Sequence, residues 1–164
     1  MGQQQLLLLV LGIVIVGLAV VVGINAFGEN QKRANADALV NDGLRIASDL
    51  QAYALKPAQF GGSGGFGKLI AEDPDDDFFR DGLGYSLDSD GNYTNVNGRF
   101  TFEDATDTGG IVIQGENADQ SNVVQIRVCG VTSREILTAI SYEGSGSVIA
   151  PDPCPGDAPD EPET

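Results

Sequence analysis

Apolar residues fill the N-terminal part of the chain without interruption. From Leu6 to Ile24 every residue is aliphatic or glycine, and the first charge is Glu29. A helix over this stretch is about 28 Å long, which matches a hydrocarbon core of about 30 Å. Because it is apolar on all sides, it needs lipid or other apolar helices around its whole circumference. The pattern predicts a helix that is able to span a membrane.

The next stretch is amphipathic and continues the helical period without a break. Its apolar positions recur at spacings of three and four, while Asp42, Arg45 and Asp49 fall elsewhere on the helical wheel. Lys56–Pro57 predicts the end of the helix, because the residue before a proline is steered away from the helical region. We expect a helix over 1–56, with 1–28 in the membrane and 29–56 on the rest of the chain. The stripe that we expect to be buried consists of Ala36, Leu39, Gly43, Ile46, Leu50 and Tyr53.

Residues 57–164 predict a β-rich head. The glycine-rich stretch 57–67 is expected to be a flexible connection. Beyond it, β-branched and aromatic residues gather in short runs separated by turns. The capping-box spacing of Thr132 and Glu135 leaves a helix open for the last run, although alternation of Ile136, Thr138 and Ile140 favours a strand. The runs are 85–87, 93–96, 99–102, 110–114, 122–129 and 135–142.

Short strands with short loops indicate an antiparallel meander, with one face packed on the helix stripe. The expected fold class is therefore α+β: a long N-terminal helix on a C-terminal antiparallel sheet. The head should end in a proline-rich, acidic tail from about 151 to 164, whose composition suits neither helix nor strand.

Composition excludes several kinds of chemistry. The 164 residues include no His and only 2 Cys, which removes Ser-His and Cys-His nucleophile pairs, His-ligated metals and a structural zinc site. A net charge of -15 argues against nucleic acid as a partner, because affinity for a polyanion comes mostly from Lys and Arg. No carboxylate pair has a spacing that indicates acid-base catalysis. We expect neither an enzyme nor a cofactor.

A cleaved secretory signal is one alternative for the apolar segment. Such signals usually have an apolar part of about 7 to 15 residues behind a basic start. Here the apolar run is longer, and Met1 to Gln5 carry no Lys or Arg. We therefore expect the segment to be retained, either as a plain single-pass anchor or as part of a polymer.

The arrangement resembles the type IV pilin superfamily, which includes bacterial pilins and the pseudopilins of type II secretion. The resemblance rests on residues 1–57, on the helix end at Lys56–Pro57, and on the late cysteines Cys129 and Cys154. It implies that a prepilin peptidase cuts after a glycine and that the apolar half-helix passes from the inner membrane into the core of an extracellular filament. Gly2–Gln3 is the candidate junction, and Met1 as the mature first residue is the alternative.

The resemblance also implies the partners and the buried residues. The partners would be further copies of this chain, the inner membrane before assembly, the prepilin peptidase and the pilus assembly machinery. Adhesion, motility, DNA uptake and secretion are all open as uses of the fibre. The residues implied for the filament core are Leu6, Leu7, Leu9, Val10, Ile13, Val14, Val16, Leu18, Val20, Val21 and Ile24.

The N-terminal segment departs from the family in two ways. The glutamate usual near the mature start is replaced by Gln5, or by Leu7 if cutting follows Gly2, so subunit alignment must use neutral hydrogen bonds or none. The family's common proline in this segment is absent. Gly12, Gly17 and Gly23 stand in the helix instead, either as points of local unwinding in a polymer or as places where helices approach closely.

The two cysteines allow only one pairing, Cys129 with Cys154, which would pin the tail. We expect this disulfide if the head is extracytoplasmic. Two free thiols are the alternative for a cytosolic head.

Two acidic segments are candidate cation sites. Asp88, Asp90 and Asn92 match the first ligands of a calcium loop, but the glycine after them and the distal glutamate are absent. The match is incomplete, and we expect no metal. Asn92-Tyr93-Thr94 is also a formal glycosylation sequon, in a turn that is expected to be within reach of an enzyme, but such tripeptides often occur by chance. The charge run 72–77 is read as a solvated loop in preference to a calcium site.

The leading hypothesis is a structural subunit of a pilus-like filament. A membrane-tethered binding module outside the cytoplasm and a secretion-system pseudopilin are the alternatives.

Overall fold

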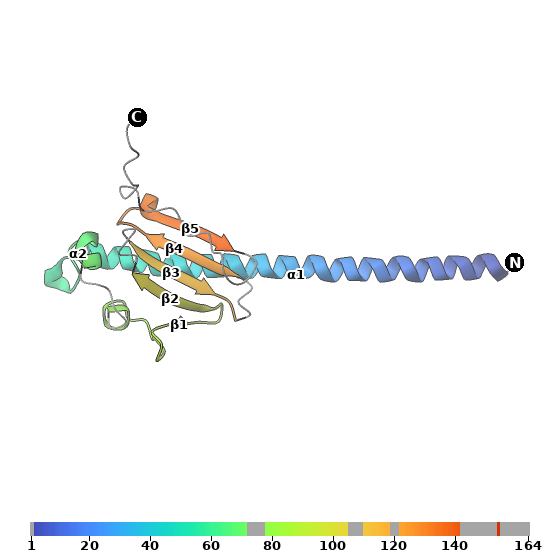
Figure 1. The fold of residues 1–164 in the computed structure, drawn as a ribbon, viewed down its shortest axis with the longest axis horizontal. Helices are drawn as coiled ribbons and strands as arrows, with labels where there is room; N and C mark the ends of the chain where they lie inside the picture. The colour runs from blue at the N-terminus through green and yellow to red at the C-terminus, as the bar shows by residue number, and fades with distance from the viewer. Residues whose placement is uncertain (1, 72–77, 105–109, 119–121, 142–153, 155–164) are drawn as a thin grey trace, which may run out of the picture. The chain divides into compact units, whose positions relative to one another are not determined.

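The computed structural model describes residues 2–71, 78–104, 110–118, 122–141 and 154 (Figure 1). The chain forms two compact units, Met1–Ala34 and Asn35–Thr164, which we call the N-terminal and C-terminal units and describe separately. The fold class is α+β, as predicted, with a long helix and a five-stranded antiparallel sheet.

Helix α1 runs from Gly2 to Leu55 and has 54 residues. It ends one residue before Lys56–Pro57, which confirms the predicted stop. Both the apolar first half and the amphipathic second half are helical, because nothing in either half breaks the backbone pattern of i to i−4 hydrogen bonds. By length and composition, α1 is able to cross a membrane.

The sheet is a meander of neighbouring strands in the order β1-β2-β3-β4-β5, and every pair is antiparallel. This confirms the predicted topology. The strands are β1 (Tyr93–Thr94), β2 (Arg99–Asp104), β3 (Ile111–Glu116), β4 (Val123–Val128) and β5 (Ile136–Ser141). The predicted run 85–87 forms no strand, and only Leu87 makes an isolated bridge, to Tyr93.

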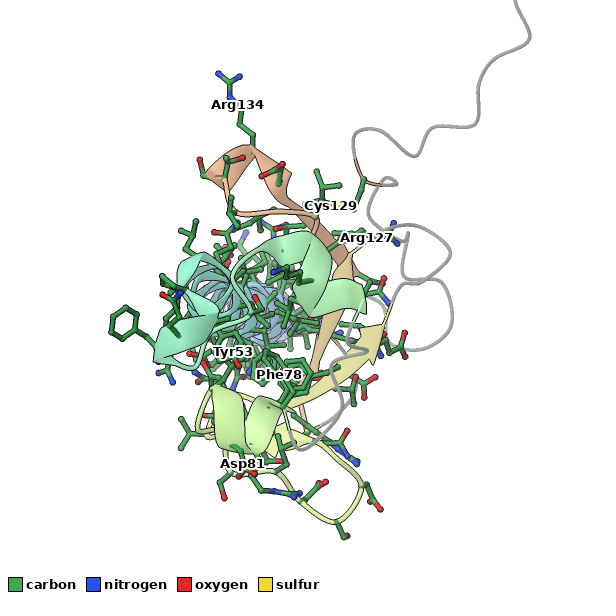
Figure 2. The ribbon with its side chains drawn as sticks, turned by 90° about the vertical axis from the view of Figure 1, so that its left-hand side faces the viewer. Tyr53, Phe78, Asp81, Arg127, Cys129 and Arg134 are labelled. Carbon is green, nitrogen blue, oxygen red and sulfur yellow. A yellow bond between two sulfur atoms is a disulfide. The ribbon has the colours of Figure 1, made fainter. Side chains whose placement is uncertain are left out.

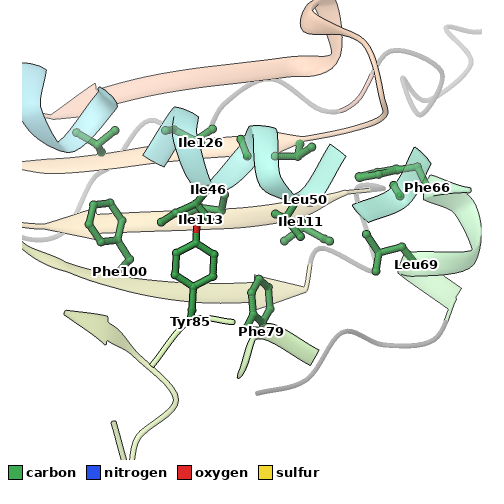
Figure 3. Close-up of a cluster of buried hydrophobic side chains, with 14 of the residues drawn as sticks. Ile46, Leu50, Phe66, Leu69, Phe79, Tyr85, Phe100, Ile111, Ile113 and Ile126 are labelled. Atoms are coloured by element: carbon green, nitrogen blue, oxygen red, sulfur yellow. The ribbon is translucent and has the colours of Figure 1, made fainter. Parts of the chain in front are cut away.

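The core of the C-terminal unit lies between the second half of α1 and one face of the sheet (Figure 3). Leu39, Ile46 and Leu50 are at most 1% exposed. Ala36 and Gly43 are also buried, and Tyr53 is half-buried at the rim, so the structure confirms the predicted stripe. The sheet contributes alternate residues, because successive side chains of a strand point to opposite faces. These buried residues are Phe100, Ile111, Ile113, Val124, Ile126 and Val128.

The connection after α1 is folded, and the predicted flexible linker is wrong. It contains the 3-10 turn η1 (Ala58–Phe60) and leads into helix α2 (Phe66–Ala71). Gly61 has φ of +79° and closes η1, and the Gly64 N–H donates to the Lys56 carbonyl at 3.1 Å. The glycines therefore serve tight turns, which only residues without a Cβ form at low cost.

Two further turns position aromatic and capping residues. The π-helical turn η2 (Phe78–Gly82) buries Phe79, whose ring stacks on Phe102 with centroids 3.9 Å apart. The 3-10 turn η3 (Ser133–Glu135) carries the capping box between Thr132 and Glu135. Strand β5 follows it directly, so the capping signal and the strand alternation are both realised, one after the other.

Candidate functional site: an exposed apolar helix and a closed sheet unit

The N-terminal unit exposes its apolar side chains on every side. Among the large apolar residues from Leu6 to Phe27, exposure ranges from 50% for Leu11 to 73% for Phe27. All residues expected in a filament core belong to this set: Leu6, Leu7, Leu9, Val10, Ile13, Val14, Val16, Leu18, Val20, Val21 and Ile24. Covering each one is worth about 1.5 to 3 kcal/mol. This surface therefore requires lipid or apolar protein around it.

The three glycines of this segment leave room along the helix. A Cβ added to Gly12, Gly17 or Gly23 would meet no other atom within 4 Å. All three are helical in the single chain, so unwinding in a polymer stays a prediction. The open space also suits close approach of a second helix, as small residues allow in apolar surroundings.

The first turn of α1 contains the candidate processing junction. Gly2 and Gln3 are helical and exposed, and the first turn has no acidic residue. Cleavage at this junction is not decided by the conformation and stays a prediction.

Polar side chains of α1 tie the helix to both ends of the sheet. The side-chain amide of Gln51 donates to the carbonyls of Gly130 at 2.8 Å and Thr132 at 3.0 Å. At the other end, Asp42 Oδ2 accepts from Asn95 Nδ2 at 2.8 Å and Asn97 Nδ2 at 2.7 Å. No local pattern in the sequence predicts these hydrogen bonds. The polar positions that flank the buried stripe of α1 indicate only that some side chains of the helix could bond to the sheet unit.

A third tie involves Tyr85, whose hydroxyl donates to Asp49 Oδ2 at 2.5 Å. Burial, and then the bond to the Asp49 carboxylate, raise the pKa of Tyr85 to about 12. The hydrogen bond to Tyr85 is the largest cause that raises the pKa of Arg45 on the same helix. The neutral phenol thus bridges helix α1 and the segment after η2.

The predicted disulfide forms between Cys129 and Cys154, with Cα atoms 5.5 Å apart. Cys129 follows β4 directly, and Cys154 is only 6% exposed. Gly110 has φ of +142°, and a Cβ there would come within 3.0 Å of Cys154 Sγ and 2.8 Å of the Val128 carbonyl oxygen. A glycine is therefore needed beside the bridge. The disulfide suits an extracytoplasmic environment.

The Asp88–Asn92 turn is held by its own donors. Asp88 Oδ1 accepts from the N–H groups of Asp90 and Asn92, both at 2.9 Å. The Asn92 bond is the main reason why the pKa of Asp88 is lowered. Arg99 lies 3.8 Å from Asp88 and 3.7 Å from Asp90 and supplies the positive charge that a cation would bring. Within the described residues no cluster of three metal-binding side chains occurs.

Asn92 corrects one expectation. Asn92 is only 5% exposed, and its Nδ2 donates to Asp88 Oδ1 at 3.2 Å and to the Asp90 carbonyl at 3.3 Å. An enzyme cannot reach this amide without opening the turn, so the expected accessibility of the sequon is wrong for the folded chain. The charge run 72–77 and the tail, apart from Cys154, lie outside the described residues.

No family model, curated protein or solved structure matches this chain. Any assignment of a fold type therefore rests on the geometry of the chain alone. A long apolar N-terminal helix continues into an amphipathic half, and that half packs on a C-terminal antiparallel sheet. A late disulfide joins the residue after β4 to Cys154. The architecture is pilin-like.

Proposed function

We propose that this chain is the structural subunit of a type IV pilus-like extracellular filament. The observation that carries the proposal is the exposure of every large apolar side chain from Leu6 to Phe27 on a helix whose continuation is anchored in a folded unit. Such a surface is shared among copies once it leaves the bilayer. Its partners are further copies of the chain, the inner membrane before assembly, a prepilin peptidase and an assembly machine.

Energetics support assembly by exchange of one apolar environment for another. Burial of this surface away from water is worth on the order of 25 to 50 kcal/mol. Almost none of this free energy favours a filament core over the bilayer, because both environments are apolar. Helix packing and contacts between C-terminal units would decide the balance, as expected where the hydrophobic effect does not drive helix association.

The alternatives differ in what the helix does. A membrane-tethered binding module would keep the segment in lipid permanently. A pseudopilin would form only short assemblies in a secretion system. In either case no catalytic role is assigned, and the lack of histidine removes the commonest general base.

Electron microscopy tests the proposal. The full chain is expressed in a host that has a type IV pilus assembly machine, and the sheared cell-surface fraction is examined by negative stain. Long fibres that contain the chain are expected. Retention of all the protein in the membrane fraction, under conditions in which the host's own pilin assembles, would contradict the proposal and favour the tethered module.

A further inference from the structure

The described surface of the C-terminal unit has few exposed large apolar side chains, and they are not spread evenly. From residue 35 on, they are Leu55, Phe60, Val96 and Ile140. Val96 is 98% exposed. Leu55 and Phe60 are 64% and 72% exposed and lie close together in sequence, at the end of α1 and in η1.

Val96 is presented by a rigid turn. The Asn95 N–H donates to the Gly98 carbonyl at 2.9 Å, and Asn95 Oδ1 accepts from the N–H groups of Asn97 and Gly98. Asp42 on α1 accepts hydrogen bonds from the side-chain amides of both Asn95 and Asn97. A fully exposed valine on a turn with so many internal bonds loses little further entropy when it docks.

A cleft of about 800 Å³ opens at the other end of the same unit. It lies between the end of α1, the η1–α2 segment and the loop after β4, and Figure 2 looks onto this end of the unit. Most of its walls are apolar. Residues that line it include Leu55, Pro57, Phe66, Val131 and Cys154. Phe60 belongs to the same η1 turn as Ala58 and Gln59, which also line the cleft.

The turn and the cleft face opposite ends of the unit. Gly98 packs against Leu39, and the cleft begins at Ala54 and Leu55. From Leu39 to Leu55, α1 rises about 24 Å. If a protruding turn at one end of the unit docks into a cleft at the other end, the contact is heterologous. Such a contact excludes a two-fold dimer and generates an open helical assembly wherever the rotation between copies does not close a ring.

The charges around the two surfaces are complementary. Lys68 lines the cleft, in a chain that has a net charge of -15. Glu135 also lines it, but its carboxylate is engaged by the Thr132 N–H and hydroxyl. Near the turn, Glu116 lines the same hollow as the turn residues, and its carboxylate accepts a hydrogen bond from Gln114 at 2.7 Å, whereas Arg99 faces Asp88 and Asp90. Carboxylates thus outnumber cations beside the turn, which suits the ammonium of Lys68 in the cleft of another copy.

We propose that the turn Asn95–Gly98 of one copy seats Val96 in the cleft formed by Leu55, Phe66 and Val131 of the next copy along the filament. This inference rests on the proposed function and names the contact between C-terminal units. Covering Val96 and the cleft removes from water the most exposed large apolar side chain among the described residues of the unit, which stabilises the contact.

Cysteine cross-linking in assembled material tests the contact. The variant Val96→Cys/Leu55→Cys, in the full chain with its native disulfide intact, is assembled, oxidised and run on a non-reducing gel. A ladder of linked oligomers is expected. The single variants Val96→Cys and Leu55→Cys should give no ladder, because one thiol per copy links at most two copies.

A second variant probes the energy of the contact. Val96→Asp should lower the yield of sedimentable polymer roughly tenfold, as loss of a buried anchor does. The matched control Ser89→Asp adds the same charge to the other exposed turn and should assemble normally. Circular dichroism of both detergent-solubilised chains checks that each is folded.

The outcomes are distinguishable. If wild-type fibres form but no ladder appears, and Val96→Asp assembles as well as Ser89→Asp, this contact is wrong and the filament proposal stands. If the wild-type chain forms no fibres in any condition, both proposals fail.

Discussion

Gly43 on helix α1 packs directly against Ile126 at the centre of strand β4. A Cβ at position 43 would overlap Ile126 Cδ1 and approach Phe100 Cε1 at 3.8 Å. The glycine therefore lets the helix lie close to the sheet without displacing the Ile126 side chain, and a large side chain at this position has no room.

We predict that Gly43→Leu destabilises the C-terminal unit by about 1 to 3 kcal/mol, as overpacking of a filled core does. Chemical denaturation followed by near-ultraviolet circular dichroism measures the loss. Gly28→Leu is the matched control, because nothing lies within 4 Å of a Cβ there. Equal stability of the two variants would show that the helix does not press on Ile126.

A charge in the apolar segment should abolish polymers. Ile13→Asp places a carboxylate in the middle of the apolar run, where such a charge costs about 2.5 to 3.5 kcal/mol in a membrane. Immunoblotting of sheared surface fractions, with microscopy, gives the readout. Ile13→Leu and Asn30→Asp should assemble normally, the latter because it adds the same charge next to Glu29. Normal fibres from Ile13→Asp would count heavily against the polymer.

Removal of the disulfide should weaken the C-terminal unit and leave α1 helical. The bridge closes a loop with a sequence separation of 25. In the chain-entropy model this stabilises by about 3.5 kcal/mol, which should be lost in Cys129→Ala/Cys154→Ala. Urea unfolding measures the loss, and limited proteolysis shows whether the tail becomes accessible. Adding reductant to the variant should change nothing further, and unchanged wild-type stability under reducing conditions would refute the prediction.

Tyr85 should make stability fall at high pH. An unfolded tyrosine has a pKa of about 10, whereas the folded value is about 12. The folded state holds the proton more tightly, so this contribution is complete below about pH 10 and is lost as pH rises towards about 12.

The measurement compares wild type with Tyr85→Phe by urea unfolding at about pH 8 and about pH 11. At the lower pH the free energy of unfolding should be larger for the wild type than for Tyr85→Phe. This difference between the two proteins should shrink at the higher pH. Tyr53→Phe serves as the control and should keep the dependence on pH. A difference that stays constant would mean that burial and the bond to Asp49 do not raise the pKa of Tyr85 in the folded chain.

Patterns that repeat along the chain made most of the fold predictable. The end of α1, the buried stripe and the antiparallel meander followed from helical period, a proline and strand alternation, because these features act over a few residues and are strong. The connection after Pro57 was misread as flexible. Its glycines support turns only in combination with the Lys56 carbonyl and the packing of Phe66, which local sequence does not encode.

Hydrogen bonds between residues that are far apart in sequence could not be predicted either. Asp49 and Tyr85, or Asp42 and Asn97, are far apart in sequence, and any of many polar side chains could have paired with them. The turn at Asn92 shows the same limit, since a motif of three residues does not reveal that the folded chain covers its amide.

The amino-acid sequence by itself determined that an apolar helix of membrane length leads into a helix with one stripe to bury, because hydrophobic period and proline act locally. Tertiary structure alone decided that Val96 stands on a rigid turn at one end and that a cleft opens at the other. Both depend on how α1, the sheet and the disulfide come together, and no short stretch of residues contains that information.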